Sequence, residues 1–468
     1  MKRREALKNL ALTVPASFIL PSLAGCSNDD GPGGSFNAKV VIIGAGAAGL
    51  RAASLLHSQG IEVQILEASA THGGRIQNNK ERLSDFPLEL GADEILGSEN
   101  SWYKLTADTG VPLVQRLASN SYVLDGNVGT LEDYQNDTDF QLARGFRDSI
   151  PGYTGSDVTV QNAIQSSGIN QRVYHIMEGE IGNQYGSSND RIGMRGLASA
   201  QRAMVEFGDS YVVEDQSHFT IISSVFSDVI PFIRYNSPVT SIDYSGAKTM
   251  ISLQGGEIIE ANKVIVTVPI TILQEGSISF TPSLPGSKLN ALNNIGMDAG
   301  MKVFIRFNGN FWGSGIGTII SDGLVPRYYA PGIGRSEVNN ILAGYIMGSK
   351  AETLRALSEQ EIYTTLLGEL DALYNGNASR LVSLRDDAIE GVIKDWANEP
   401  YIKGAYSYPK VGAALSRETI ALPVNKTLFF AGEATSTNGN FGTVQGALDS
   451  AERAVSEILE VLAEENIS

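Results

Sequence analysis

A glycine-rich turn set between two apolar strands, within residues 39–67, constrains the fold of this chain more than any other feature. The first strand is the β-branched run Val-Val-Ile-Ile at 40–43, which is typical of a strand buried on both faces of a parallel sheet. Three glycines follow at once in the G-x-G-x-x-G spacing: Gly44, Gly46 and Gly49. This spacing allows a tight turn, a close approach of the backbone to a pyrophosphate, and close packing of the next helix on the strand.

The residues after the glycines continue the pattern of a dinucleotide-binding βαβ unit. We expect a helix rich in small residues from Ala47 to about Ser58, with its first N–H groups and its dipole directed at phosphate oxygens. Ile61 to Leu66 form the second strand, and Glu67 ends it where a carboxylate accepts hydrogen bonds from a ribose diol. A glycine turn alone is weak evidence, but strand, helix, strand and acid in register predict a dinucleotide site.

Length and charge limit the class of the protein and its partners. With 468 residues, the chain is long enough for two or three domains with large cores. The formal net charge of −17 argues against nucleic acid as a partner and favours cationic small molecules, although acidity also serves solubility. The four histidines lack metal-ligand spacing, and no P-loop, H-E-x-x-H or G-x-S-x-G sequence occurs. We therefore expect neither a metal site nor a serine hydrolase.

Residues 1–26 have the features of an export signal rather than of a folded domain. A twin arginine lies in the basic start, a short apolar region follows, and Leu-Ala-Gly-Cys at 23–26 resembles a bacterial lipobox. Cys26 is the only cysteine in the chain, so lipidation there would leave no thiol for a disulfide. Residues 27–36 are expected to form a flexible tether. These features predict an exported periplasmic or cell-envelope lipoprotein, anchored to a membrane only through Cys26.

A second glycine turn and several further elements follow the βαβ unit. The turn Gly-Gly-Arg at 73–75 ends in Arg75, whose guanidinium can face a pyrophosphate. An extended segment follows, in which the backbone at Gly91 can lie against a flat group. The pattern further predicts a β-meander over 232–253, buried strands near 263–269 and 426–430, a capped helix from Ser358, and a final helix from Val444.

Together these segments resemble the flavin-dependent amine oxidase family, which includes monoamine and polyamine oxidases. The resemblance implies an α/β fold, in which a Rossmann-like FAD-binding domain is interleaved with a mixed α/β substrate domain. Residues 37–98, 215–290 and 410–468 would form the FAD-binding domain, and residues 99–214 and 291–409 the substrate domain. The positions that match the family's FAD contacts are Gly44, Gly46, Ala48, Gly49, Glu67, Ala68, Arg75, Gly91, Val239, Gly432, Glu433 and Val444.

A single lysine interrupts the alternating strand pattern of residues 301–307. A lysine on a strand usually faces solvent. The family, however, has a lysine at this position that holds a water against flavin N5, and the sequence Gly300-Met301-Lys302 fits that motif. The resemblance therefore makes Lys302 the first candidate for a catalytic side chain.

The resemblance also assigns aromatic residues to the substrate pocket. Tyr406 takes the place of the family's aromatic that faces the substrate across the flavin, and Tyr345 lies on the strand that borders the pocket. Monoamine oxidases have a cysteine before that aromatic, which bonds covalently to the flavin. Here the residue is Ala405, which implies FAD held non-covalently. Thr443 stands where the second aromatic of the monoamine oxidase cage would fall, which puts a complete cage in doubt.

Glu94 bears on the choice of substrate. Relatives that oxidise L-amino acids carry an arginine in the segment after Leu-Gly, and Glu94 takes that place here. In the pocket, it would repel amino acids and attract a second cationic centre, as in a di- or polyamine; it could equally be a surface acid.

These observations predict an FAD-dependent amine oxidase that takes hydride from the carbon next to an amine nitrogen, with oxygen as acceptor and hydrogen peroxide as product. Three alternatives stay open at this point. One is a periplasmic amine dehydrogenase that uses another electron carrier, a second is a desaturase-type flavoenzyme, and the third is a surface lipoprotein that binds flavin without catalysis.

Overall fold

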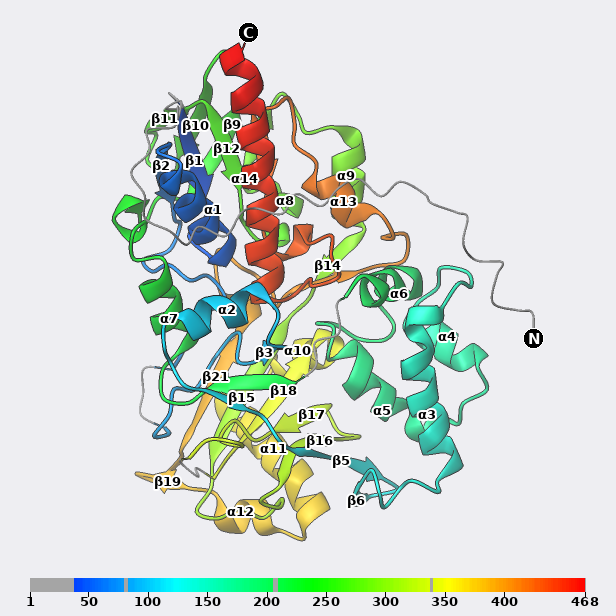
Figure 1. Ribbon diagram of the computed structural model, residues 1–468. Helices are drawn as coiled ribbons and strands as arrows, with labels where there is room; N and C mark the ends of the chain where they lie inside the picture. Colours follow the sequence, from blue (N-terminus) through cyan, green and yellow to red (C-terminus); the bar gives the residue numbers. More distant parts are fainter. Residues whose placement is uncertain (1–37, 80–82, 205–208, 337–339, 468) are drawn as a thin grey trace, which may run out of the picture. The chain divides into compact units, whose positions relative to one another are not determined.

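The computed structural model describes residues 38–79, 83–204, 209–336 and 340–467 (Figure 1). The expected export signal, the lipobox at Cys26 and the tether lie outside the described residues. Within the described ranges, no helix combines the length and the apolar character needed to cross a membrane.

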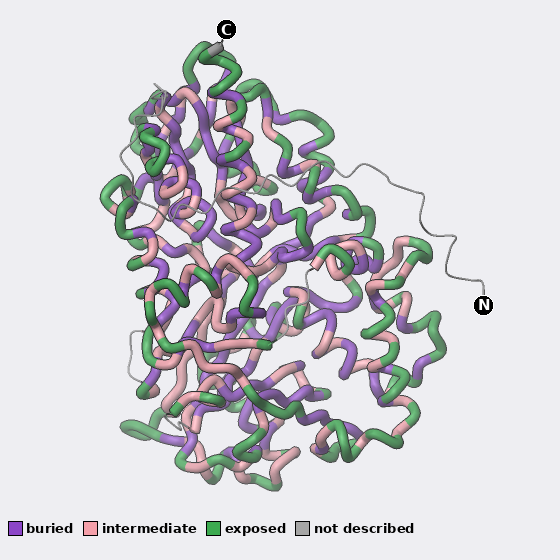
Figure 2. The backbone as a smooth tube through the Cα atoms, in the orientation of Figure 1, coloured by how far each residue is buried: buried purple, intermediate pink, exposed green. Residues whose placement is uncertain are grey.

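A five-stranded parallel sheet begins with the predicted βαβ unit. Its strand order is β23-β12-β1-β2-β8, and every pairing is parallel. The strands are β1 (Lys39–Ile43), β2 (Glu62–Leu66), β8 (Ile233–Arg234), β12 (Lys263–Val266) and β23 (Leu428–Phe430). The central strands are buried almost throughout, as their β-branched sequences predict (Figure 2).

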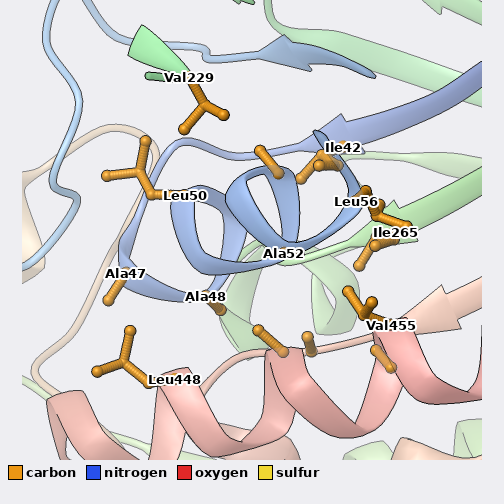
Figure 3. Close-up of a cluster of buried hydrophobic side chains, with 14 of the residues drawn as sticks. Ile42, Ala47, Ala48, Leu50, Ala52, Leu56, Val229, Ile265, Leu448 and Val455 are labelled. Carbon is orange, nitrogen blue, oxygen red and sulfur yellow. The ribbon is translucent and has the colours of Figure 1, made fainter. Parts of the chain in front are cut away.

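Two helices cover one face of this sheet, α1 (Ala47–Ser58) and α14 (Val444–Ile467). Small residues on α1 let the two helices pack closely, and alternate residues of β1 complete the same apolar cluster (Figure 3). The labelled members of the cluster are Ile42, Ala47, Ala48, Leu50, Ala52, Leu56, Val229, Ile265, Leu448 and Val455. Both predicted helices are confirmed.

The other face of the parallel sheet packs against the predicted β-meander, which is confirmed for residues 239–253 but not for residues 233–234, because these form β8 of the parallel sheet. Its strands belong to a four-stranded sheet of order β11-β10-β9-β13. They are β9 (Val239–Asp243), β10 (Thr249–Leu253), β11 (Ile258–Ala261) and β13 (Ser279–Thr281). Val41 and Ile43, which point away from α1, share an apolar cluster with Ile242 and Ile251 of this sheet.

A seven-stranded mixed sheet of order β21-β15-β18-β17-β16-β5-β6 carries Lys302 on β15 and Tyr345 on β18, whereas Tyr406 lies just before β22. Its strands are β5 (Ser119–Leu124), β6 (Asn127–Thr130), β15 (Gly300–Arg306), β16 (Ile316–Ile320), β17 (Arg327–Tyr329), β18 (Ile341–Met347) and β21 (Gly391–Asp395). Helix α11 (Glu359–Tyr374) packs Leu366 against Val303 and Ile346 of this sheet, and it begins at the predicted capping box of Ser358 and Glu361. The opposite face is therefore left for the site.

The remaining helices and strands connect these sheets. The helices are α2 (Ser101–Asp108), α3 (Thr138–Ser149), α4 (Val160–Ser166), α5 (Tyr174–Met177), α6 (Met194–Ala203), α7 (His218–Val225), α8 (Ile270–Gln274), α9 (Gly286–Asn293), α10 (Gly348–Leu354), α12 (Asn377–Leu381) and α13 (Ser416–Ala421). The strands are β3 (Ile95–Leu96), β4 (Leu113–Gln115), β7 (Ser210–Val213), β14 (Ile295–Met297), β19 (Leu384–Arg385), β20 (Ala388–Ile389) and β22 (Ser407–Pro409). The predicted fold class, an α/β fold with a Rossmann-like half, is confirmed, whereas the predicted domain boundaries stay a prediction.

Candidate active site

A cavity of about 1040 Å³ runs from the glycine turn to the seven-stranded sheet. Its wall contains every predicted cofactor and substrate residue except Gly49, which lies behind the turn. The site residues lie up to about 400 positions apart in the sequence, from Gly44 to Val444. The fold therefore brings the predicted residues to one continuous space, while their individual contacts with a ligand stay predictions.

The glycine turn has the shape that a pyrophosphate requires. Gly44 has a positive φ of 107°, and a Cβ at Gly49 would lie 1.9 Å from the carbonyl oxygen of Gly44, so both positions need glycine. A Cβ at Gly46, by contrast, would meet no atom within 4 Å and would point into the cavity. Gly46 is also the N-cap of α1, with no side chain capping the helix. The first turn of α1 thus offers N–H groups to an anion.

Glu67 is held in place beside this turn. Its Oε2 accepts a hydrogen bond from the Ala45 N–H at 2.7 Å, and its Oε1 accepts from both the N–H and the hydroxyl of Ser69 at 2.8 and 2.7 Å. The side chain is buried but lines the cavity. A carboxylate oxygen has two lone-pair directions, so these contacts orient Glu67 and leave acceptor capacity for a ribose diol.

The partly buried Arg75 and the buried Glu433 form an ion pair in the wall of the cavity. Nη1 of Arg75 donates to Oε1 of Glu433 at 2.9 Å and to the carbonyl oxygen of Ala405 at 3.0 Å. Glu433 also accepts from the Ser407 hydroxyl at 2.6 Å and from the Gly442 N–H at 2.7 Å. Burial alone would raise the pKa of Glu433, but the nearby guanidiniums outweigh it and hold that pKa below its usual value. The pair ties three segments of the cavity wall together.

Lys302 lies inside the protein, so the solvent-facing alternative is wrong. The residue is only 2% exposed, and its ammonium donates to the Gly91 carbonyl at 2.7 Å and to the Glu89 carbonyl at 3.3 Å. It also forms an ion pair with Asp93 at 2.8 Å. An ammonium has three N–H groups, and these three acceptors match them. Lys302 therefore fixes the segment that carries Gly91 against β15.

Asp93 is a site residue that the sequence did not reveal. Burial would raise its pKa, but the ammonium of Lys302 and the guanidinium of Arg116 lower it below its usual value, so the carboxylate is charged. The neighbouring Glu89 behaves differently, because burial raises its pKa to about 8 and its Oε2 has no hydrogen-bond partner among the described residues. The Oε1 atom of Glu89 accepts a hydrogen bond from the backbone N–H of His218 at 2.8 Å. The only sequence signal was the position of both acids next to Gly91.

Tyr345 and Tyr406 form a hydrogen-bonded pair of rings at the far end of the cavity. Their hydroxyl oxygens lie 2.7 Å apart, and Tyr406 also donates to the carbonyl of Gln184 at 2.7 Å. A Cβ at Gly186 or Gly442 would come within 2.6 Å of the Tyr406 ring, so both glycines make room for it. Burial raises the pKa of Tyr345 and of Tyr406 above the usual value, which keeps both phenols protonated.

Two predicted substrate residues line the cavity with their polar groups already engaged. Glu94 forms an ion pair with Arg116 and accepts from the Ser210 hydroxyl at 3.2 Å. The hydroxyl of Thr443 donates to the Asn440 carbonyl at 2.6 Å and accepts from the Gly446 N–H at 3.0 Å. Glu94 therefore presents a compensated charge rather than a free carboxylate.

Ala405 also lines the cavity, and its methyl group has no nucleophile for a covalent bond to a flavin. The aromatic ring of Phe441 and the amide of Gln184 also line the cavity near Tyr406, and sequence analysis singled out neither residue. The open glycine turn, the oriented Glu67 and the length of the cavity all fit a flavin dinucleotide. Within the described residues, no cluster of histidine, cysteine or acidic side chains could hold a metal ion.

Comparisons with known proteins agree with this geometry. The family model described as flavin containing amine oxidoreductase matches residues 47–172 and 231–459. Lysine-specific histone demethylase 1B of Mus musculus is 26% identical over 90% of this chain and 53% of its own length. Polyamine oxidase 5 of Oryza sativa subsp. japonica is 23% identical over 88% and 85%. The chain spans about half the length of the histone demethylases that it matches.

Solved structures agree in fold. Putrescine oxidase bound to putrescine superposes with a TM-score of 0.76 at 18% identity, covering 90% of this chain and 99% of that one. Cyclohexylamine oxidase from Brevibacterium oxydans gives a TM-score of 0.76 at 20% identity, covering 91% and 99%. The chain therefore belongs to the flavin-containing amine oxidoreductase family, and its cofactor is FAD.

Proposed function

We propose that this protein oxidises a primary or secondary amine in an FAD-dependent reaction. The observation that carries the proposal is the single cavity, which joins the dinucleotide cradle at Gly46 to the buried Lys302 and the Tyr345–Tyr406 pair. FAD held at Gly46 and Glu67 would supply the electron chemistry, which is hydride removal from the carbon next to the amine nitrogen, with oxygen as the final acceptor and hydrogen peroxide as product.

The two tyrosines bind and orient the substrate in this proposal. Because their pKa values are raised, neither ring forms a phenolate at neutral pH, and neither acts as a base. Their faces provide a wall against which the reacting C–H bond is held, and their shared hydrogen bond fixes both rings. An apolar, aromatic surface also favours the neutral amine, which is the form that loses hydride.

Lys302 has a separate role. Its contact with the Gly91 carbonyl holds the backbone that would lie against the flavin ring, and its positive charge lies buried close to that point. A fixed cation stabilises negative charge that develops nearby. We further propose that Lys302 holds a water at the reacting atoms, which requires it to exchange its longest contact, the one to the Glu89 carbonyl at 3.3 Å.

The cellular setting is part of the proposal. The twin arginine, the lipobox and the single Cys26 support export and a lipid anchor in the periplasm or cell envelope. The electron acceptor would then be oxygen or a periplasmic carrier. Labelling of the full chain with a radioactive fatty acid, lost in Cys26→Ser, tests the anchor; incorporation that survives the substitution would contradict it.

Anaerobic reduction of the bound flavin tests the activity. The FAD-loaded full chain is mixed with primary, secondary and polyamines, and loss of the oxidised flavin absorption is followed. Bleaching by at least one amine is expected, and a yellow protein that no amine bleaches would support a non-catalytic flavin lipoprotein. Reoxidation by oxygen, compared with an artificial electron carrier, separates an oxidase from a dehydrogenase.

Variants of two neighbouring lysines sharpen this test. Lys302→Met should slow flavin reduction or reoxidation, since the fixed cation is lost. Lys394 is paired with Lys302 across β21 and β15 but contacts Glu399 and the ring of Trp396 instead. Lys394→Met should therefore change both rates far less, and equal effects of the two substitutions would refute a special role for Lys302.

A further inference from the structure

Arg327 occupies a position in the candidate active site that no sequence motif pointed to. It lies on β17 directly opposite Tyr345 on β18, and Tyr345 lies directly opposite Lys302 on β15. Residues paired in this way point to the same face of a sheet, and all three side chains line the cavity. Because neighbouring strands lie about 4.8 Å apart, Arg327 starts roughly 10 Å from Lys302, on the far side of the tyrosine pair.

Among the described residues, no carboxylate lies within 4.0 Å of the guanidinium of Arg327. Four cationic side chains line the cavity in the part of the chain that the structure describes, and three of them have a carboxylate within 4.0 Å. These three are Arg75, Lys302 and Lys403. Arg327 instead donates to the side-chain carbonyl of Gln184, a neutral amide at the rim of the cavity. A guanidinium has five N–H donors, so most of its hydrogen-bonding capacity is left for a ligand.

The charge of Arg327 acts on the substrate end of the cavity. Arg327 donates to the side chain of Gln184, and the backbone carbonyl of the same residue accepts from the Tyr406 hydroxyl, so the guanidinium lies near the tyrosine pair. Burial raises the pKa of Tyr345 and of Tyr406, and the positive charge of Arg327 opposes that rise in both. The acids at the same end do not cancel it, since Asp93 is paired with Lys302 and Glu94 with Arg116. The substrate end therefore carries one uncompensated positive charge among the described residues.

We propose that Arg327, with Gln184, forms an anion subsite and that the substrate is an amine that also carries a carboxylate. This inference rests on the proposed amine oxidation and specifies its substrate class. A carboxylate accepts two parallel hydrogen bonds from a guanidinium, a geometry that adds selectivity as well as affinity. A diamine would bring a second ammonium toward the same guanidinium and be disfavoured. The compensated Glu94 offers no opposing attraction.

Matched substrate pairs test the proposal. Amino acids with the amine at the α or the terminal carbon are each compared with the amine that lacks the carboxylate, and putrescine represents the diamines. The FAD-loaded wild type should reduce its flavin with higher kcat/KM for at least one carboxylate-bearing member. In Arg327→Gln, that advantage should fall about 10- to 100-fold, mainly through KM, because a charge-assisted pair is lost. Amines without a carboxylate should be affected little, and Arg327→Glu should shift preference toward putrescine.

Arg385→Gln is the matched control. Arg385 lies on β19, its side chain is 68% exposed, its ion-pair partner is Glu390, and neither residue lines the cavity. A wild type that prefers amines without carboxylates, or a substrate preference that Arg327→Gln leaves unchanged, would overturn the subsite even though amine oxidation holds. If no compound reduces the flavin, amine oxidation itself fails. In that case, the affinity for unreactive carboxylates still tests the anion subsite, and it is measured from changes in the flavin absorption spectrum of the wild type and of Arg327→Gln. Equal affinity of the two proteins would overturn the subsite.

Discussion

Replacing Asp93 with asparagine tests whether the negative charge of Asp93 compensates the buried ammonium of Lys302. The ammonium and the carboxylate lie 2.8 Å apart, and their side chains are 3% and 29% exposed. Removing one partner of a fully buried ion pair costs about 3 to 5 kcal/mol, because the remaining charge is left uncompensated. Asp93 is partly exposed and asparagine keeps an acceptor, so we expect the free energy of unfolding of Asp93→Asn to fall by about 2 to 3 kcal/mol.

Urea unfolding at a fixed FAD concentration measures this loss, since free FAD changes the apparent stability by mass action. Glu464→Gln is the control, because its ion pair with Lys426 has side chains that are 64% and 65% exposed. Both of these charges are solvated, so that pair should contribute far less to the free energy of unfolding than the pair of Asp93 with Lys302. An Asp93→Asn protein as stable as Glu464→Gln would refute the view that Asp93 compensates the buried Lys302.

Three further substitutions follow from the site and its supports. Gly46→Val should fold, since Gly46 has an ordinary φ of −78°, but its side chain would enter the cavity; FAD content should fall severalfold, and normal FAD content would contradict the cradle. Burial raises the pKa of Glu89 to about 8, so the folded state holds its proton and stability falls as pH rises from about 4.5 to 8. Glu89→Gln should lessen that fall in stability. If the stability of the wild type and of Glu89→Gln changes with pH in parallel, the raised pKa of Glu89 is contradicted. Ser358→Ala removes the cap of α11 and should lower the unfolding free energy by about 1 kcal/mol, measured by urea unfolding; an unchanged midpoint would show that the cap contributes nothing.

Local patterns account for what the sequence predicted well. The strand, turn and helix around Gly44 follow from β-branched residues and glycine spacing, which act over a few residues and keep their meaning in any context. The cap at Ser358 is equally local. The family resemblance placed Lys302 near Gly91 although more than 200 residues separate them in the sequence.

Long-range pairing accounts for what the sequence missed. Arg327 faces the cavity because β17 pairs with β18, and a one-residue change of register would turn it to the other face. Glu94 reads as a free acid in the sequence, but the fold places Arg116 beside it. Asp93 has a partner on a strand that follows two hundred residues later. Such partners depend on the assembled sheet, and no short sequence pattern records them.

The parallel sheet also sets an order of events for the synthesis of this protein. Its central strand β1 is among the first described segments to leave the ribosome, yet its sheet is completed by β23, and α14 closes the cluster over α1. Glu433, which pairs with Arg75, likewise comes from the last tenth of the chain. A growing chain therefore exposes the apolar face of α1 until the final helix is made. The complete cradle includes Glu433 and the start of α14, so FAD can meet it only once this late part of the chain has left the ribosome.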